Sequence, residues 1–295
     1  MYHPELARIA RFLPRHLVNA RTAPVMQYLT RRMGRGAVPD GVEVLTLSSG
    51  VKLRLHRPRG MATPGPALLW IHGGGYVLGS PAQDDRLCRR FAAALGATVA
   101  AVEYRLAPKD PYPAGLEDCY AALTWLTQLP TVDPARVAIG GASAGGGMTA
   151  ALALLARDRG EVPLAAQILV YPMLDDRTVG PEFDDPGHRL WTQGSNAYGW
   201  KAYLGKADPE IAVPARNPDL SGLPPAWIGV GTLDLFHDED LVYAQRLREA
   251  GIPVDVEVVD GAFHGFDGLA PKTAVSQGFF DSQVATLRRV FIAGS

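Results

Sequence analysis

The sequence predicts an α/β fold in which helices flank a mostly parallel central sheet and a helical cap covers one end. Short apolar runs alternate with helical patterns along most of the chain, which is typical of a parallel sheet. An antiparallel start precedes this alternation, and one long segment, 173–225, interrupts it. With 295 residues, 47% of them hydrophobic, the chain is suited to one large domain with a small subdomain.

The strands begin with VEVLTL (42–47) and VKLRLHR (51–57), which a short turn separates, so we expect an antiparallel hairpin. The runs that follow are largely apolar, as in strands buried on both faces. Gly160 and Gly251 stand just past the ends of two helical patterns, where glycine commonly ends a helix. The further predicted strands are 67–72, 98–104, 136–142, 165–172, 226–232 and 254–259. The predicted helices are 83–95, 113–129, 144–159, 238–250 and 273–292, with a short one in 193–205.

Two segments lie outside this alternation. Within residues 1–40, Leu6, Ile9, Leu13 and Leu17 recur at helical spacing, with arginines on another face, which predicts one amphipathic helix through them. We interpret residues 1–40 as surface helices docked on the body; a membrane-surface or transit segment is the alternative. Segment 173–225 is too long for a simple connection. We expect it to form a cap insertion together with residues 1–40, above a main domain of residues 41–172 and 226–295. The alternative is an irregular surface excursion.

The overall composition gives no indication of several classes of protein. The formal net charge is −1, without the basic surplus typical of nucleic-acid or membrane-surface proteins. No run of about 18 apolar residues occurs, so we expect no membrane-spanning insertion. Cys88 and Cys119 are too few for a disulfide scaffold or a zinc site, which predicts free buried thiols and, most simply, a cytoplasmic protein.

The stretch IGGASAGGGMTA (139–150) is rich in glycine. A phosphate loop would need a following lysine, which is absent here, and GVGTLD (229–234) lacks the third glycine of a dinucleotide motif. The pattern G-x-S-x-G does fit, from Gly141 to Gly145, between a predicted strand and a predicted helix. Such a turn exposes the hydroxyl of Ser143 above the sheet. Taken alone, the motif is equally compatible with a glycine-rich turn that holds an idle serine.

A serine hydroxyl becomes a good nucleophile only when a base takes its proton, and a histidine base needs an acidic side chain that orients its ring. His264 lies just beyond strand 254–259, at the edge of the sheet where sites gather in open α/β folds. Asp234 directly follows strand 226–232, which gives the order Ser…Asp…His. Asp238 and Asp260 are rival acids, but the first is placed to cap a helix and the second to form a turn.

Besides a serine, a base and an acid, the predicted site needs donors to a negative oxygen, and the stretch WIHGGGYVLGS is a candidate for them. Its glycines follow a buried strand, and glycine lets backbone N–H groups point at a developing negative oxygen. We expect Gly74, Gly75 and Ala144 to donate to this oxyanion, and His72 to support the loop rather than act as a base.

These motifs together resemble the hormone-sensitive-lipase-like branch of the α/β-hydrolase fold, the bacterial family IV carboxylesterases. The resemblance covers about residues 65–270 and includes IHGGGYVLGS, YRLAPKDPYPAGLEDCYAALTWL, GASAGG, DLFHDED and FHGF. Two positions depart from the family pattern. Ala142 stands where Asp is usual, and DLFHDED replaces the usual D-P-L-R-D-E-G.

The resemblance implies a serine carboxylesterase with Ser143, Asp234 and His264 as its triad and with no cofactor or metal. The cap favours small ester substrates with short to medium acyl chains. An amide, carbamate or lactone hydrolase with the same triad is the alternative, and a non-catalytic ligand receptor is a further one. A homodimer is also expected from the resemblance alone. Candidate aromatic walls of the substrate pocket are Tyr76, Tyr171, Phe183, Trp191 and Trp200.

Overall fold

The computed structural model describes residues 1–34, 36, 38–58 and 60–293. Its central element is one twisted sheet. Within these residues it has eight strands in the order β1-β2-β4-β3-β5-β6-β7-β8. Strand β2 pairs antiparallel with β1 and β4, and every later pairing is parallel. The strands are β1 (Val42–Thr46), β2 (Lys52–His56), β3 (Gly65–Ile71), β4 (Thr98–Glu103), β5 (Val132–Ala142), β6 (Ala166–Val170), β7 (Ala226–Leu233) and β8 (Val254–Phe263).

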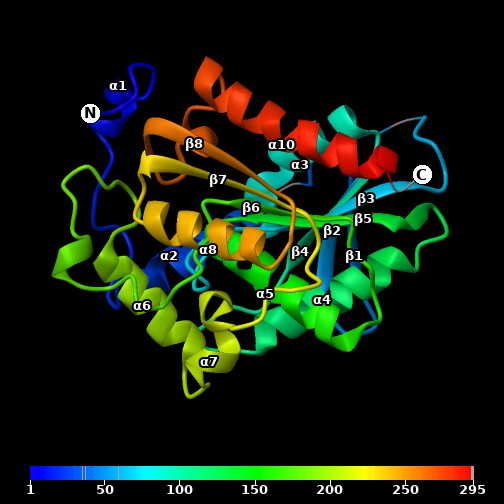
Figure 1. Cartoon of the computed structure of the whole chain (residues 1–295), viewed down its shortest axis with the longest axis horizontal. Helices are drawn as coiled ribbons and strands as arrows, with labels where there is room; N and C mark the ends of the chain where they lie inside the picture. Colours follow the sequence, from blue (N-terminus) through cyan, green and yellow to red (C-terminus); the bar gives the residue numbers. More distant parts are fainter. Residues whose placement is uncertain (35, 37, 59, 294–295) are drawn as a thin grey trace.

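Helices cover both faces of the sheet (Figure 1). Helices α3 and α10 lie on one face, and α4, α5 and α8 lie on the other. The fully buried β3 shows the resulting pair of cores, because Leu69 and Ile71 enter one cluster while Leu68 and Trp70 enter the other. These helices are α3 (Asp85–Leu95), α4 (Ala114–Thr127), α5 (Ala144–Arg159), α8 (His237–Glu249) and α10 (Ala274–Ala293).

The predicted fold class, hairpin and strand–helix alternation are therefore confirmed. Gly160 ends α5 in the left-handed conformation, as its position in the sequence indicates. The prediction of one N-terminal helix through Leu6, Ile9, Leu13 and Leu17 is wrong. Helix α1 (Ala7–Ala10) has a single turn, and the next helix, α2 (Ala23–Gly34), begins only after an irregular stretch. Pro14 explains the break, because proline cannot donate the backbone hydrogen bond of a helix interior.

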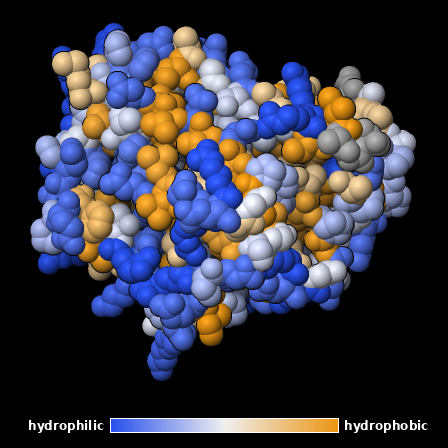
Figure 2. All heavy atoms as spheres, in the orientation of Figure 1, coloured by the Kyte–Doolittle hydropathy of each residue, from blue (hydrophilic) through white to orange (hydrophobic). Residues whose placement is uncertain are grey.

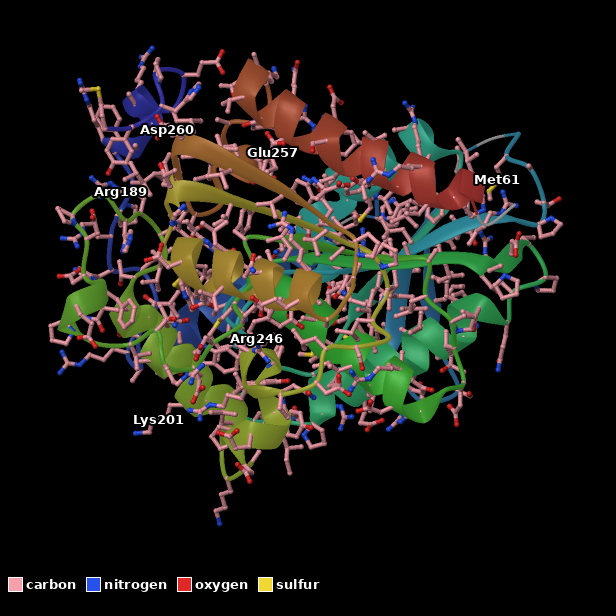
Figure 3. All side chains as sticks on the ribbon, in the orientation of Figure 1. Met61, Arg189, Lys201, Arg246, Glu257 and Asp260 are labelled. Carbon is pink, nitrogen blue, oxygen red and sulfur yellow. The ribbon has the colours of Figure 1, made fainter. Side chains whose placement is uncertain are left out.

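Segment 173–225 contains α6 (Gln193–Leu204) and α7 (Pro209–Ala212) and contacts the N-terminal segment directly. The Arg189 side chain, labelled in Figure 3, donates from Nε to the carbonyl oxygen of Ala10 at 2.9 Å. Ser195 Oγ donates to the carbonyl oxygen of Val18, also at 2.9 Å. The two segments that we expect to form the cap thus lie together, and their role as a cap remains a prediction.

The surface is mainly hydrophilic on the face drawn in Figure 2, with a band of hydrophobic residues across it. Val258 on the edge strand β8 and Val242 on α8 are 42% and 59% exposed. Cys88 and Cys119 are buried and unpaired, as predicted. None of the described helices combines the length and the apolar character needed to cross a bilayer. The expected homodimer and the cytoplasmic location stay predictions.

Candidate active site

The turn between β5 and α5 holds Ser143 in a strained backbone conformation. Its φ is 59° and its ψ is −123°, which a non-glycine residue rarely adopts. The backbone holds the turn on both sides. Ser143 N donates to Val170 O at 2.9 Å, and Ser143 O accepts from the N–H groups of Gly147 and Met173 at 3.0 Å each.

The glycines around Ser143 leave room that a side chain would need. A Cβ atom at Gly145 would lie 2.1 Å from the carbonyl oxygen of Ile71, and one at Gly141 would lie 2.4 Å from that of Gly145. At Gly147 a Cβ atom would meet Met173 O at 2.0 Å. These contacts are with backbone atoms, which cannot swing aside. The glycine-rich sequence is therefore required by close packing of α5 against the strand ends.

Three side chains from distant parts of the chain meet above this turn. His264 Nε2 lies 2.9 Å from Ser143 Oγ, and His264 Nδ1 lies 2.8 Å from Asp234 Oδ2. The other oxygen of Asp234 accepts a hydrogen bond from the backbone N–H of Phe236 at 3.0 Å. All three are buried, with Ser143 7%, Asp234 3% and His264 8% exposed. A serine hydroxyl, an imidazole and a carboxylate are thus in hydrogen-bond contact, which is the geometry that the predicted nucleophile, base and acid would need.

The two rival acids do not reach His264. The Asp238 side chain is 91% exposed and contacts its neighbour, His237, at 2.7 Å. Asp260 lies at the outer edge of β8 (Figure 3), where it accepts a hydrogen bond from Thr232 Oγ1 at 3.2 Å. Both residues end up in local surface contacts.

The HGGG loop follows β3 and runs beside the turn. Gly74 and Gly75 both have positive φ, and among the described residues neither backbone N–H donates to another group. Ala144 is the first residue of α5, where N–H groups have no partner within the helix. Within the part of the chain that the structure describes, each of the three predicted oxyanion donors is therefore without an acceptor.

His72 anchors this loop from below. Its Nδ1 contacts the carbonyl oxygen of Gly73 at 2.9 Å, and its ring stacks on Tyr104 with 4.4 Å between centroids. The hydroxyl of Tyr104 donates to His72 O at 2.9 Å. Burial lowers the pKa of the His72 imidazole to about 4, so the ring is neutral at physiological pH. These contacts fit the supporting role predicted for His72.

The five aromatic candidates for pocket walls occupy different environments. Trp191 lies against the HGGG loop, because a Cβ atom at Gly75 would be 2.0 Å from its ring. Tyr171 lies edge-on to His264 with 4.8 Å between ring centroids. Tyr76 donates to Met173 O at 3.0 Å and packs near Trp200, and both are at most 2% exposed. Phe183 is partly buried against the core. Whether any of them contacts a substrate stays a prediction.

Two further residues near His264 were not predicted from the sequence, Phe236 and Asp267. The ring of Phe236 packs edge-on to His264 with 5.3 Å between centroids. Asp267 accepts a 2.7 Å hydrogen bond from the Tyr171 hydroxyl, which fixes the ring that touches His264. The signals in the sequence were their positions, because Asp267 stands three residues after His264 and Phe236 two residues after Asp234.

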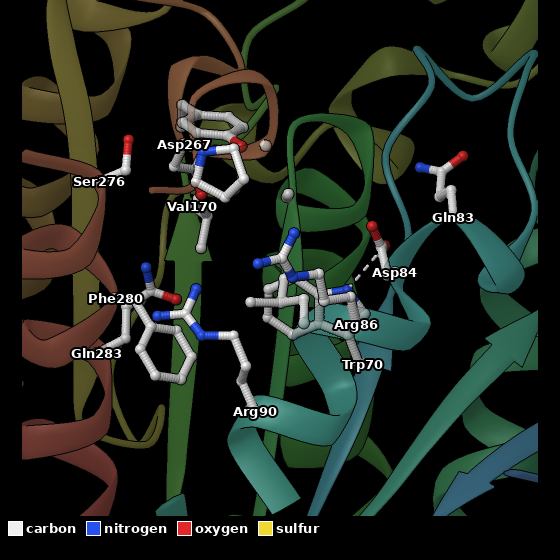
Figure 4. Close-up of a pocket in the computed structure, with 15 residues that line it drawn as sticks. Trp70, Gln83, Asp84, Arg86, Arg90, Val170, Asp267, Ser276, Phe280 and Gln283 are labelled. Carbon is white, nitrogen blue, oxygen red and sulfur yellow. Dashed lines mark hydrogen bonds between the residues drawn. The ribbon is translucent and has the colours of Figure 1, made fainter. Parts of the chain in front are cut away.

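A cavity of about 180 Å³ lies behind the turn, and Ala142 lines it (Figure 4). Asp84 and Asp267 approach it from different elements, and Trp70 Nε1 donates to Asp84 Oδ2 at 2.9 Å. Burial, with a smaller contribution from the nearby Asp267, raises the pKa of Asp84 from its ordinary value to about 7, although the hydrogen bond from Trp70 lowers it. Ala142 and Tyr171 both line this cavity, so the small side chain at position 142 leaves open space beside Tyr171.

Glu239 holds the loop that follows β6. Its Oε1 accepts from the backbone N–H groups of Leu174 and Asp175 at 2.8 and 3.1 Å. Burial nevertheless raises the pKa of this carboxyl from its ordinary value of 4.5 to about 8. The folded protein therefore holds a proton that the unfolded chain releases. The stabilisation is complete below the unfolded pKa and is lost as the pH rises through about 8.

Glu239→Gln is expected to make stability less dependent on pH. The amide resembles the protonated carboxyl and keeps an acceptor for Leu174 and Asp175. From about pH 6 to about pH 9, the wild type should lose about 2 kcal/mol more of its free energy of unfolding than the variant. Denaturant unfolding at both pH values measures this difference. Parallel losses in both proteins would contradict the assignment.

The fold and this cluster of side chains define a hydrolase of the α/β class. The family described as alpha/beta hydrolase fold matches residues 68–268, and the chain belongs to that family. It is 36% identical over 213 residues to the esterase LipI of Mycobacterium tuberculosis, covering 70% of this chain and 67% of the relative. It is 34% identical to the carboxylesterase NlhH of the same organism over 254 residues, covering 82% and 79%.

Solved structures agree with these relatives. A bacterial heroin esterase superimposes with a TM-score of 0.86 at 38% identity, and the match covers 98% of each chain. The protein is therefore an enzyme of the hydrolase class. Among the described residues, no group of three His, Cys, Asp or Glu side chains is arranged to hold a metal ion.

Proposed function

We propose that this protein is a serine carboxylesterase of the hormone-sensitive-lipase-like family IV, which hydrolyses esters with short to medium acyl chains. The observation that carries the proposal is the continuous contact from Ser143 Oγ through His264 to Asp234, at 2.9 and 2.8 Å. The relatives named as esterases support ester hydrolysis as the reaction.

In the first half of the reaction, Ser143 Oγ attacks the ester carbonyl carbon while His264 Nε2 takes the hydroxyl proton. The carbonyl oxygen becomes negative and accepts from the N–H groups of Gly74, Gly75 and Ala144. Asp234 keeps the proton on His264 Nδ1 and stabilises the imidazolium. When the carbon–oxygen bond of the ester breaks, His264 gives its proton to the leaving alcohol, and an acyl group remains on Ser143.

Water completes the reaction on the same atoms. His264 takes a proton from a water molecule whose oxygen attacks the acyl carbonyl, and the oxyanion forms at the same N–H groups. Collapse of this intermediate releases the carboxylic acid and returns the proton to Ser143 Oγ. The neutral His72, beneath the loop, plays no part in these proton transfers.

A fluorophosphonate probe tests whether Ser143 is the nucleophile. The probe should add to one serine, and peptide mass spectrometry should locate it on Ser143, because only an activated serine reacts. Asp238→Asn, a change at an exposed side chain, should be labelled like the wild type. A protein that hydrolyses no ester and takes up no probe would instead be a ligand receptor on this fold.

The acyl-chain preference is expected to lie at about four to eight carbons. Ser143 is only 7% exposed, and Trp191 packs on the HGGG loop beside it, so room for an acyl chain is restricted. Turnover of 4-nitrophenyl esters from C2 to C16 measures the preference. The 4-nitroanilide of the best acyl chain serves as comparison and should react more slowly. A maximum at C16, or at emulsified triglyceride, would contradict the prediction.

A further inference from the structure

The N-terminal segment carries a charge opposite to that of the rest of the chain. Residues 1–36 contain seven arginines and a single acidic residue, Glu5, so their formal charge is +6. The whole chain has a net charge of −1, which leaves −7 on the remaining residues. Such an asymmetry indicates that this segment faces an anionic partner.

Helix α2 within this segment uses one face to dock on the body of the protein. Ala23 is 3% exposed, and Gln27 Nε2 donates to the carbonyl oxygens of Val77 and Ala107 at 2.9 and 3.3 Å. The inner face of α2 is thus fixed to the chain just after the HGGG loop.

The outer face of α2 is apolar and exposed. Val25, Tyr28 and Leu29 are 61%, 64% and 50% exposed. They fall within an arc of about 100° by helix geometry, and the exposed Arg32 lies in the same arc. Arg21 stands two residues before the helix, and among the described residues neither arginine takes part in an ion pair. An apolar centre with a cation at each end is typical of helices that lie at a membrane surface.

We propose that the outer face of α2 binds an anionic lipid surface. Val25, Tyr28 and Leu29 would enter the boundary between headgroups and acyl chains, while Arg21 and Arg32 would contact anionic headgroups. The inner contacts of α2 hold this face outward, so binding needs no unfolding of the segment. The proposal does not rest on the proposed esterase function.

Charge and chemistry favour a lipid surface over the other partners. A nucleic acid would neutralise the arginines but would leave Val25 and Leu29 without an apolar partner. A second copy of this chain would bring like charges together, because an antiparallel pair of α2 helices places Arg21 opposite Arg32. An anionic bilayer surface matches both the apolar centre and the charged ends.

Co-sedimentation of the full chain with vesicles tests the proposal. Vesicles of equal parts phosphatidylcholine and phosphatidylglycerol should bind the protein, and vesicles of phosphatidylcholine alone should bind it at least about tenfold more weakly. About 0.5 M NaCl should reduce the binding, because salt screens the arginines. Binding that is equal for both vesicles would overturn the proposal.

Variants of α2 locate the surface. V25S/L29S and R21E/R32E should each reduce the partition onto anionic vesicles at least about tenfold. V242S alters a valine of similar exposure on α8 and should bind like the wild type. All variants should turn over a water-soluble ester at the wild-type rate, so loss of binding is separable from loss of activity.

Three outcomes would contradict the proposal that the outer face of α2 binds lipid. Unchanged binding by V25S/L29S would overturn it, and so would an equal loss in V242S. The third outcome is a wild-type dimer that V25S/L29S converts to monomers with vesicle binding unaffected, which would make the face an interface between copies.

Discussion

Ser143→Ala is expected to lower kcat for a 4-nitrophenyl ester on the order of 10⁶-fold, by comparison with other serine hydrolases. In the proposed mechanism the hydroxyl oxygen bonds to the substrate, and among the described residues no other hydroxyl or thiol is hydrogen-bonded to His264. Alanine removes only Oγ, so the strained backbone of the turn is kept by its own hydrogen bonds. Steady-state kinetics on purified variant, with circular dichroism to show folding, measures the effect.

The matched control is Ser49→Ala, which alters an exposed serine in the turn between β1 and β2. It should retain full activity. The residual rate of Ser143→Ala should still exceed that in water by 10³- to 10⁴-fold, on the order found in other triads, because the oxyanion donors and the binding site remain. Near-normal turnover by Ser143→Ala would remove the acyl-enzyme from the mechanism.

The fold could be predicted from the sequence because its signals are local. Each strand of the parallel sheet is an apolar run, and each helix repeats apolar residues at its own period. The order Ser143, Asp234, His264 was also readable, since each residue follows a predicted strand and the ends of parallel strands meet at one edge of the sheet. Position along the chain was enough to favour Asp234 over Asp238.

What the sequence did not show depends on contacts across the fold. Phe236 and Tyr171 reach His264 from two different strand ends, and no spacing links them in sequence. The cavity beside Ala142 arises where Asp84, just before α3, approaches Asp267 in the short helix α9 (Phe266–Leu269) that follows β8. The predicted N-terminal helix is absent for a local reason, because Pro14 interrupts the chain between apolar residues that are otherwise at helical spacing.

Asp234→Asn is expected to lower kcat on the order of 10⁴-fold while leaving the fold intact. Asp234 Oδ1 accepts from Phe236 N, and Oδ2 faces His264 Nδ1. In the variant, the amide oxygen keeps the bond from Phe236, so the amide NH₂ faces the imidazole. His264 must then accept at Nδ1 and carry its proton on Nε2, toward Ser143. That tautomer cannot take the serine proton.

Asp238→Asn and Asp260→Asn are the controls that decide which carboxylate acts. Both side chains make surface contacts away from His264, so both variants should react at the wild-type rate. If either control lowered kcat on the order of 10⁴-fold, that residue and not Asp234 would be the acid that orients His264.

The double variant Ser143→Ala/Asp234→Asn tests whether Asp234 contributes to catalysis only by orienting His264 or also in some independent way. Asp234 acts only through His264, which has no proton to take once Oγ is gone. The double variant should therefore be no slower than Ser143→Ala alone. Losses that multiply would instead mean that Asp234 stabilises the transition state by a route other than His264.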